Sequence, residues 1–401
     1  MSKEISFDEF DEQEEEVSLL DELRTHVEQH FTIRNAFHEY MPTFIVEATE
    51  TKESMKALKE DVATLGLTPS LRKYASYEPL LVLSFFNLDE RKTGFPTKNV
   101  LLLIATIATV SLAGYLHAIA LLTLRPEANL IFEIFLFVVA VMGIIGLHEM
   151  GHFFLSKWYD IDASLPYFIP SIPPFGTFGA FISLRELHLN RDELFDVGVF
   201  GPIFGFIVTI IVTLFGIMLS PFLMPETIQA LTEQGGGDFI SLPEPLLFTV
   251  LINLLVSTGL LVIPTGAVLV LHPVAFAGWV GMYITALNLF PITQLDGGHV
   301  SRSLFGEKGH RYVGIVALAI VFVILAFFSL ASAIIIIMVL LFFMRARHPG
   351  PLDDVSKLSN YRKLIAIAAY AILVICMPIP QSLINFLINP LEFIRTFLSG
   401  I

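Results

Sequence analysis

The sequence predicts a mainly α-helical, polytopic membrane protein with a small N-terminal α/β soluble domain and a short β-hairpin. Two observations lead to this fold class. Hydrophobic residues make up 54% of the 401 residues and charged residues only 15%, whereas soluble domains are about a quarter charged. The charges also concentrate before residue 99 and leave long uncharged stretches after it. We therefore exclude a soluble globular protein and a disordered chain.

Net charge and cysteine content exclude further classes. The formal net charge of −14 argues against nucleic acid as a partner, because the phosphate backbone is bound by clustered Lys and Arg. The single cysteine, Cys376, leaves no disulfide framework and no cysteine-built zinc site. The acidic start lacks a basic region followed by an apolar core, so we expect neither a secretory signal peptide nor an organellar transit peptide.

The distribution of charge and hydropathy divides the chain into four regions. We expect an acidic flexible tail, a small α/β cytoplasmic domain, a membrane core, and a C-terminal part with a loop, a transmembrane helix and an amphipathic tail. In this order the regions are residues 1–30, 31–97, 98–345 and 346–401.

The small domain combines strands with a helix. Residues 43–48 and 79–86 have the apolar and β-branched character of strands. Residues 51–65 repeat apolar side chains at helical spacing, and Gly66 follows as a stop signal. We see no catalytic motif in this part of the sequence, so its expected role is that of a scaffold or a regulatory contact.

Stretches with few or no charges locate the membrane segments. Between residues 245 and 295, proline and glycine favour one full span at about 273–290, preceded by a partial or re-entrant segment around 246–271. A pair of short helices turning near Ser329 is expected within residues 312–344. The number of spans stays open. The other predicted spans are 99–124, 133–158, 197–225 and a last one that begins at residue 364.

Basic residues give the orientation. Arg91, Lys92 and Lys98 precede the first predicted span, and Lys157 ends the second. Because Lys and Arg accumulate on the cytoplasmic side, we expect a multi-pass protein of the cell membrane with its N-terminal domain in the cytoplasm.

One group of ionisable residues lies inside a predicted span. His148, Glu149 and His152 form the pattern H-E-x-x-H near the end of the second span. Residues four apart share a helix face, so both imidazoles can bind one Zn²⁺, and Glu149 can polarise a bound water. The alternative is a helical histidine pair that bonds a neighbouring helix. Charged groups inside a membrane are costly, which favours the functional interpretation.

A hydrolytic zinc site usually has a third protein ligand. Asp296 ends the long uncharged run and is the first candidate, while His299 is the competing one. Pro291 breaks the preceding helix, and the glycines at 297–298 free the backbone to bend. Asn288 lies two helical turns before Asp296 and is placed to donate a hydrogen bond to a substrate carbonyl.

These motifs resemble the site-2 protease family of intramembrane zinc metalloproteases, especially its archaeal and plastid-type branch. The resemblance covers about residues 98–345 and rests on residues 148–152, 176–182, 195–202 and 288–298. It implies one Zn²⁺ per chain on His148, His152 and Asp296, with Glu149 as the base. It also implies regulated intramembrane proteolysis: cleavage of single-span membrane-protein substrates within the bilayer, near the cytoplasmic face. A PDZ-like insert, which many relatives carry, is not visible in this sequence.

Two glycine-containing segments complete the prediction. Residues 175–184 suit a short hairpin near the active site, where Gly176, Phe178 and Gly179 would hold the substrate as an added strand. The alternative is an ordinary cytoplasmic hairpin. Along the third span, three glycines share one face and favour close helix packing. They are Gly198, Gly201 and Gly205.

Two other functions use the same residues. A metal transporter needs a path of ligands toward the outer face, but the first span offers only His117. A membrane protein that has lost catalysis would not need Glu149. The sequence names no substrate, does not say whether a prior cut is required, and leaves the oligomeric state unknown.

Overall fold

The structure is a computed structural model that describes residues 19–38, 41–74, 80–87, 96–233, 242–326, 338 and 348–378. Its residue contacts group into two compact units. The N-terminal unit comprises residues 1–94, 185–195 and 349–362, and the membrane unit comprises residues 95–184, 196–348 and 363–401. The predicted tail before residue 19, the turn near Ser329 and the amphipathic end after residue 379 lie outside the described residues. The boundaries of the four predicted regions stay predictions.

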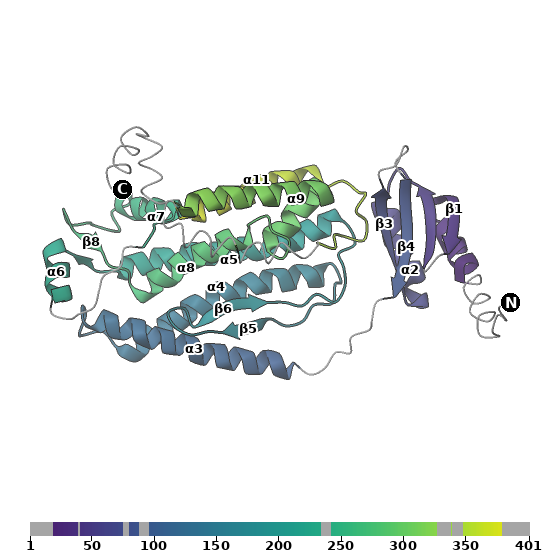
Figure 1. Cartoon of the computed structure of the whole chain (residues 1–401). Coiled ribbons are helices and arrows are strands. Elements are labelled where there is room, and N and C mark those ends of the chain that lie inside the picture. The colour runs from purple at the N-terminus through teal and green to yellow at the C-terminus, as the bar shows by residue number, and fades with distance from the viewer. Residues whose placement is uncertain are drawn as a thin grey trace, which may run out of the picture. The chain divides into compact units, whose positions relative to one another are not determined.

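A four-stranded antiparallel sheet organises the N-terminal unit, in the order β1-β2-β4-β3 (Figure 1). Its strands are β1 (Thr32–His38), β2 (Pro42–Glu47), β3 (Leu67–Tyr74) and β4 (Leu80–Asn87). Phe44 on β2 and Phe85 on β4 meet edge to face, and Met55 and Leu58 of helix α2 (Lys52–Val62) are fully buried in the same core. The sheet thus buries one strip of side chains under helices, as a half-buried sheet must.

The predicted strand–helix–strand pattern of this unit is present, with additions. Helix α2 continues as a 3-10 turn (Ala63–Leu65) and stops at Gly66, whose φ of 69° is left-handed. Strands β1 and β3 and a helix over residues 19–28 had no clear signal in the sequence. Both strands gain stability from their neighbours: β1 pairs with β2, and β3 pairs with β4 along its whole length.

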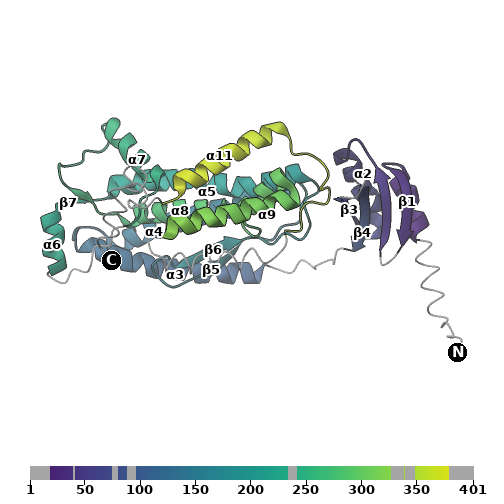
Figure 2. The ribbon, with the colours of Figure 1, turned by 45° about the horizontal axis from the view of Figure 1, so that its top comes forward.

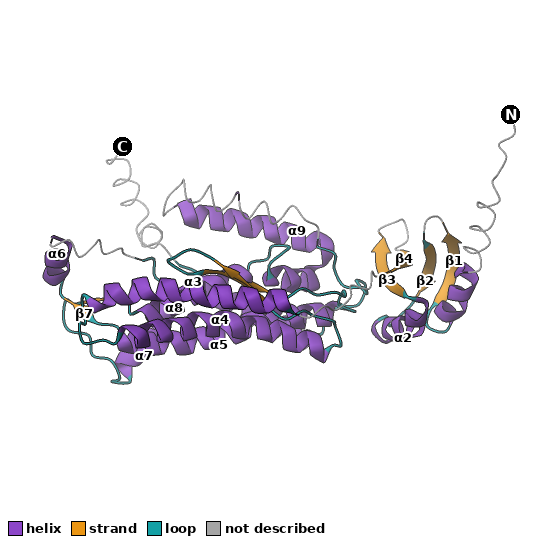
Figure 3. Cartoon of the chain, turned by 90° about the horizontal axis from the view of Figure 1, so that it is seen from below, coloured by secondary structure: helices purple, strands orange, loops and turns teal. Residues whose placement is uncertain are grey.

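Helices dominate the membrane unit (Figure 3). Three of the described helices are long and apolar enough to cross a membrane: α3 (Thr97–Leu122), α4 (Leu130–Trp158) and α5 (Arg191–Leu219). They match the first three predicted spans. The first turn of α5 belongs to the N-terminal unit and the rest to the membrane unit. The remaining helices are α6 (Pro225–Glu233), α7 (Leu246–Ser257), α8 (Pro273–Asn288), α9 (Asp296–Ala326, interrupted at Gly306) and α11 (Asn360–Cys376).

The long uncharged run contains one short and one longer helix. Helix α7 has 12 residues, which span about 18 Å and therefore fall short of a hydrocarbon core. Irregular backbone follows, in which β8 (Val268–Leu269) pairs with β7 (Phe222–Leu223). Helix α8 then starts with Pro273 at its first position, where a proline is tolerated. This arrangement is the one that the proline and glycine positions predict.

A two-stranded hairpin of β5 (Tyr167–Pro170) and β6 (Thr177–Phe181) lies alongside α3 (Figures 1 and 2). The prediction of a hairpin within residues 175–184 is wrong in its first strand, which lies earlier in the chain. The prediction fails at Gly176, because this residue has a φ of 77° and ends the connecting loop instead of starting a strand. A Cβ at Gly176 would lie 2.5 Å from the Cα of Val110, so the loop packs directly on the backbone of α3.

Candidate metal centre and active site

The last third of α4 carries the H-E-x-x-H motif. The side chain of Asn129 caps the helix start by accepting a hydrogen bond from the backbone N–H of Phe132. One helical turn separates His148 from His152, so both side chains leave the same face. These two residues and Glu149 are at most 6% exposed. Three ionisable side chains are thus buried together in a helix of otherwise apolar character.

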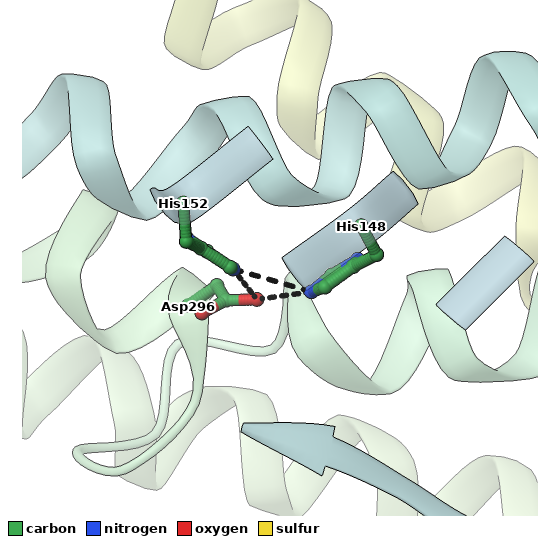
Figure 4. A group of neighbouring side chains, drawn as sticks. All are labelled: His148, His152 and Asp296. Carbon is green, nitrogen blue, oxygen red and sulfur yellow. Dashed lines mark hydrogen bonds and ion pairs between the residues drawn. The ribbon is translucent and has the colours of Figure 1, made fainter. Parts of the chain in front are cut away.

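Asp296 completes a triangle with the two histidines (Figure 4). Its Oδ2 atom lies 3.1 Å from Nε2 of His148 and 3.2 Å from Nε2 of His152, and the two nitrogens are 3.2 Å apart. Four ligands at the usual Zn–N and Zn–O lengths around a tetrahedral zinc ion lie about 3.3 Å from one another. The two imidazoles and the carboxylate therefore fit three of the four positions around Zn²⁺.

Helix α5 fixes the ring of His152. The Nδ1–H group of this histidine donates a hydrogen bond of 2.7 Å to the backbone oxygen of Val197. A carbonyl oxygen only accepts, so the proton must be on Nδ1, and the lone pair of Nε2 is free to bind a metal ion. Such an outer hydrogen bond orients histidine ligands and sets their tautomer.

A sharp connection brings Asp296 to the histidines. Helix α8 ends at Asn288, and α9 starts with Asp296 after a turn that contains Pro291. The glycines that follow have a different role from the predicted one, because neither of them is among the glycines with positive φ. A Cβ at Gly297 would instead lie 2.0 Å from the backbone oxygen of Leu289. Glycine is needed here for close approach of the turn and the helix.

Glu149 and Asn288 lie at the edge of the triangle. The Glu149 carboxylate accepts a hydrogen bond from the backbone N–H of Ile182, just after β6, and lies 4.0 Å from Nε2 of His148. Nδ2 of Asn288 is 3.2 Å from that same nitrogen. All these groups line a cavity of about 280 Å³, which Ala180 and Phe181 of the hairpin border on one side. The cavity offers room for a reactant beside the carboxylate.

The other predicted site residues lie farther from the triangle. His299 borders the same cavity, but its Nδ1 atom pairs with Nε2 of His348 at 3.0 Å, and it is not part of the metal-binding group. Gly176, Phe178 and Gly179 do not border the cavity. Gly176 packs on α3, and the side chain of Phe178 is 76% exposed. The part of the hairpin nearest the site is the end of β6 and the residues after it.

The glycine face of α5 packs on the site itself. A Cβ at Gly205 would lie 3.0 Å from Nδ1 of His148, and one at Gly198 would lie 2.5 Å from Cβ of His299. Gly201 makes the corresponding approach to His152. The sequence predicts close packing at these glycines, but it does not reveal that their partners are histidines. The spacing of glycines on one helix does not indicate which residues of another helix pack against them.

Known proteins have sequences similar to the part of the chain that contains this site. The sequence model of peptidase family M50 matches residues 136–332. A protein of Arabidopsis thaliana named "Probable zinc metalloprotease EGY1, chloroplastic" is 28% identical over 245 residues, which are 60% of this chain and 42% of that protein. A protein of Oryza sativa subsp. indica named "Probable zinc metalloprotease EGY2, chloroplastic" is 28% identical over 244 residues, or 59% of this chain and 41% of that protein.

The matches cover the elements that form the triangle. The family model covers most of α4 and all of α5, α8 and α9, and therefore includes His148, His152 and Asp296. The matched part of the chain spans well under half of the length of the two plant proteins. The matched residues and the geometry of the motif agree, and both support membership of peptidase family M50, the site-2 protease family.

Proposed function

We propose that this chain is an intramembrane zinc metalloprotease that cleaves the transmembrane segments of membrane proteins. The observation that carries the proposal is the convergence of His148, His152 and Asp296, from two helices far apart in the sequence, to ligand spacing. Glu149 is buried beside them. Three ligands with an open fourth position are typical of catalytic zinc, whereas structural zinc is closed by four.

Each residue has a proposed role in peptide hydrolysis. Zn²⁺, when bound, supplies a Lewis acid that lowers the pKa of a water molecule and polarises a carbonyl. Glu149 takes the proton from the attacking water and delivers it to the leaving amide nitrogen. Asn288 donates a hydrogen bond to the scissile carbonyl oxygen. His148, His152 and Asp296 hold the metal ion, and Val197 keeps the His152 ring in place.

The hairpin is the proposed holder of the substrate. A transmembrane helix hides its backbone amides, so it must be extended before water can reach them. Among the described strands, β6 pairs only with β5, which leaves its second edge for a substrate strand. Such added pairing supplies backbone hydrogen bonds without requiring a specific sequence. The Ile182 N–H group, which binds Glu149, lies just after this strand.

The proposed location follows from the basic residues. Lys157 lies within one and a half turns of His152 at the end of α4, and Lys98 lies in the first turn of α3. By the positive-inside rule, we place this end of the membrane unit and the N-terminal domain in the cytoplasm. The substrates are then single-span proteins of the cell membrane that are cut near the cytoplasmic face.

A reconstituted assay tests this function. The purified full chain in lipid vesicles is incubated with a single-span peptide, with and without a zinc chelator. We expect cleavage that the chelator abolishes and added Zn²⁺ restores. Glu149→Gln should keep the zinc but lose cleavage, whereas Glu127→Gln, at an exposed position, should behave like the wild type. A wild type that cleaves no such peptide, or a Glu149→Gln variant with full activity, would refute the proposal.

A further inference from the structure

A second cavity of about 420 Å³ lies in the membrane unit between α4, α8 and the hairpin. We call it the apolar pocket. Its volume is within the range of about 300–1,000 Å³ that is usual for ligand pockets. No charged side chain lines it, and its walls include Phe137 and Ile144 of α4, Phe178 of β6, and Trp279, Val280 and Ile284 of α8. An occupant must therefore be large and apolar, because a buried unpaired charge is costly.

Stacked rings give one wall of the apolar pocket a fixed shape. Phe175 stacks on Phe276 with an interplanar angle of 5°, and Phe276 stacks on Trp279 with an angle of 16°. The ring centroid of the next aromatic residue, Tyr283, lies 4.3 Å from that of Trp279. The Trp279 indole N–H is also held by a hydrogen bond of 2.9 Å to the backbone oxygen of Pro243. Such mutually packed rings lose little freedom when a ligand enters, which favours binding.

The apolar pocket and the metal-site cavity are lined by neighbouring residues of three shared elements. On α4 it is lined by Ile145, one turn before His148, and on α8 by Leu287, directly before Asn288. On β6, Thr177 and Phe178 line the apolar pocket, while Ala180 and Phe181 line the metal-site cavity. A peptide that lies extended along β6 must therefore pass both cavities.

We propose that the apolar pocket is the specificity pocket of the protease and receives one large aliphatic or aromatic side chain of the substrate's transmembrane segment. This inference rests on the proposed proteolytic function and names the substrate feature that its site selects. The pocket borders Phe178 and the base is bound at Ile182, so the selected residue lies about four positions from the scissile bond, since strands advance by one residue every 3.3 Å. It lies on the side that continues into the bilayer, because Phe137 and Ile144 precede the metal motif on the membrane helix α4.

A substrate series with a filled-pocket variant tests this inference. In a series of single-span peptides, each of positions three to six from the cleaved bond is replaced in turn by Leu, Phe, Ala or Lys. With the wild type, one of these positions should prefer Leu or Phe over Ala in kcat/KM by about tenfold or more, and Lys there should be cleaved least. Val280→Trp fills the pocket, so the preference at that position should reverse toward Ala, with other positions unaffected.

Two controls separate folding and chemistry from selection. Val139→Trp places the same bulky side chain on an exposed part of α4 outside the apolar pocket and should keep the wild-type preference. Zinc content reports whether a variant is folded, and Ile284→Phe is the milder filling variant if Val280→Trp loses its zinc. If the wild type cleaves these peptides without a preference, or with a preference that neither filling variant changes, the proposed specificity pocket is wrong. The proposed proteolytic function would still hold. A wild type that cleaves none of them overturns both.

Discussion

A side chain at Gly201 has no room beside His152, because a Cβ atom there would lie 2.1 Å from the Nε2 atom that faces Asp296. The same histidine donates its Nδ1–H group to the backbone oxygen of Val197, one turn earlier on α5. Helix α5 therefore contributes no residue to the triangle, yet it fixes one of the proposed ligands by a hydrogen bond and by a glycine. The proposed metal site depends on the close packing of two helices as well as on its own motif.

Gly201→Ala should accordingly disrupt metal binding. The new methyl group forces the His152 ring or α5 to move, and either movement breaks the spacing to Asp296. We expect zinc affinity to fall by about 10–100-fold, as it does when the support of a ligand is lost, and cleavage to fall with it. The measurement is zinc content by elemental analysis after dialysis against a weak chelator.

Gly143→Ala is the matched control for that variant. Gly143 lies on α4, and a Cβ at this position meets no other atom within 4 Å. Alanine is also favoured over glycine in a helix by about 1 kcal/mol, so this variant should retain both zinc and activity. Equal zinc content in Gly201→Ala and Gly143→Ala would show that the approach of α5 does not position His152.

The identity of the third ligand is testable by a pair of substitutions. Asp296→Asn keeps the size of the side chain but removes the negative charge that lies 3.1 Å from His148. We expect zinc to be lost or held much more weakly, because a neutral amide is a poor zinc ligand.

His299→Gln tests the competing candidate under the same conditions. Nδ1 of His299 pairs with His348 rather than joining the triangle, so this variant should keep its zinc. The reverse result, with zinc retained in Asp296→Asn and lost in His299→Gln, would move the ligand assignment to His299.

The sequence predicts those features of the site that depend on the spacing of residues within one segment of the chain. The pair of histidines is a property of four consecutive helix positions, and Asp296 stands out because it ends a long uncharged run. The hydrogen bond to Val197 and the contact of Gly201 with His152 join separate helices, so no spacing within one helix could indicate them. The choice between Asp296 and His299 as the third ligand likewise depends on the three-dimensional course of the turn at Pro291, which the sequence does not give.

The fold shows the same division between local and long-range information. Long apolar helices such as α3 and α4 follow from hydropathy alone. Strand β3 contains a proline and charged residues, so its sequence is a poor strand signal, but pairing with β4 stabilises it. The membership of residues 349–362 in the N-terminal unit depends on contacts across hundreds of residues, which no local pattern records.

Asn288→Ala should separate catalysis from metal binding. The Asn288 amide nitrogen lies 3.2 Å from Nε2 of His148 and borders the metal-site cavity, so we expect it to donate to the developing oxyanion. Loss of one such donor typically costs a factor of about 10²–10³ in kcat. Kinetics on a single-span peptide should show a lower kcat with little change in KM, at unchanged zinc content. A variant that loses zinc instead would identify Asn288 as a residue that positions His148.

Asp353 joins a distant segment to the N-terminal sheet. The carboxylate is fully buried and accepts hydrogen bonds from the Thr51 hydroxyl at 2.7 Å and from the backbone N–H groups of Val355 and Ser356 at 2.9 and 3.0 Å. The neighbouring Leu352 accepts a backbone hydrogen bond of 2.8 Å from Leu71 of β3. One acidic side chain therefore organises the turn that covers the edge of the sheet.

Asp353→Ala should weaken the N-terminal unit without affecting the metal site. It leaves three donors without their acceptor, of which the Val355 N–H group is half-buried and the other two are buried. Each unsatisfied buried group costs about 1–3 kcal/mol, so the free energy of unfolding of this unit should fall by about 2 kcal/mol or more. Hydrogen exchange of the full chain should then accelerate in residues 67–74, while zinc content stays constant. Glu60→Gln, at an exposed position of α2, should leave exchange unchanged, as surface substitutions usually do. If the β3 amides of Asp353→Ala exchange as slowly as those of Glu60→Gln, then residues 349–362 do not hold the sheet edge.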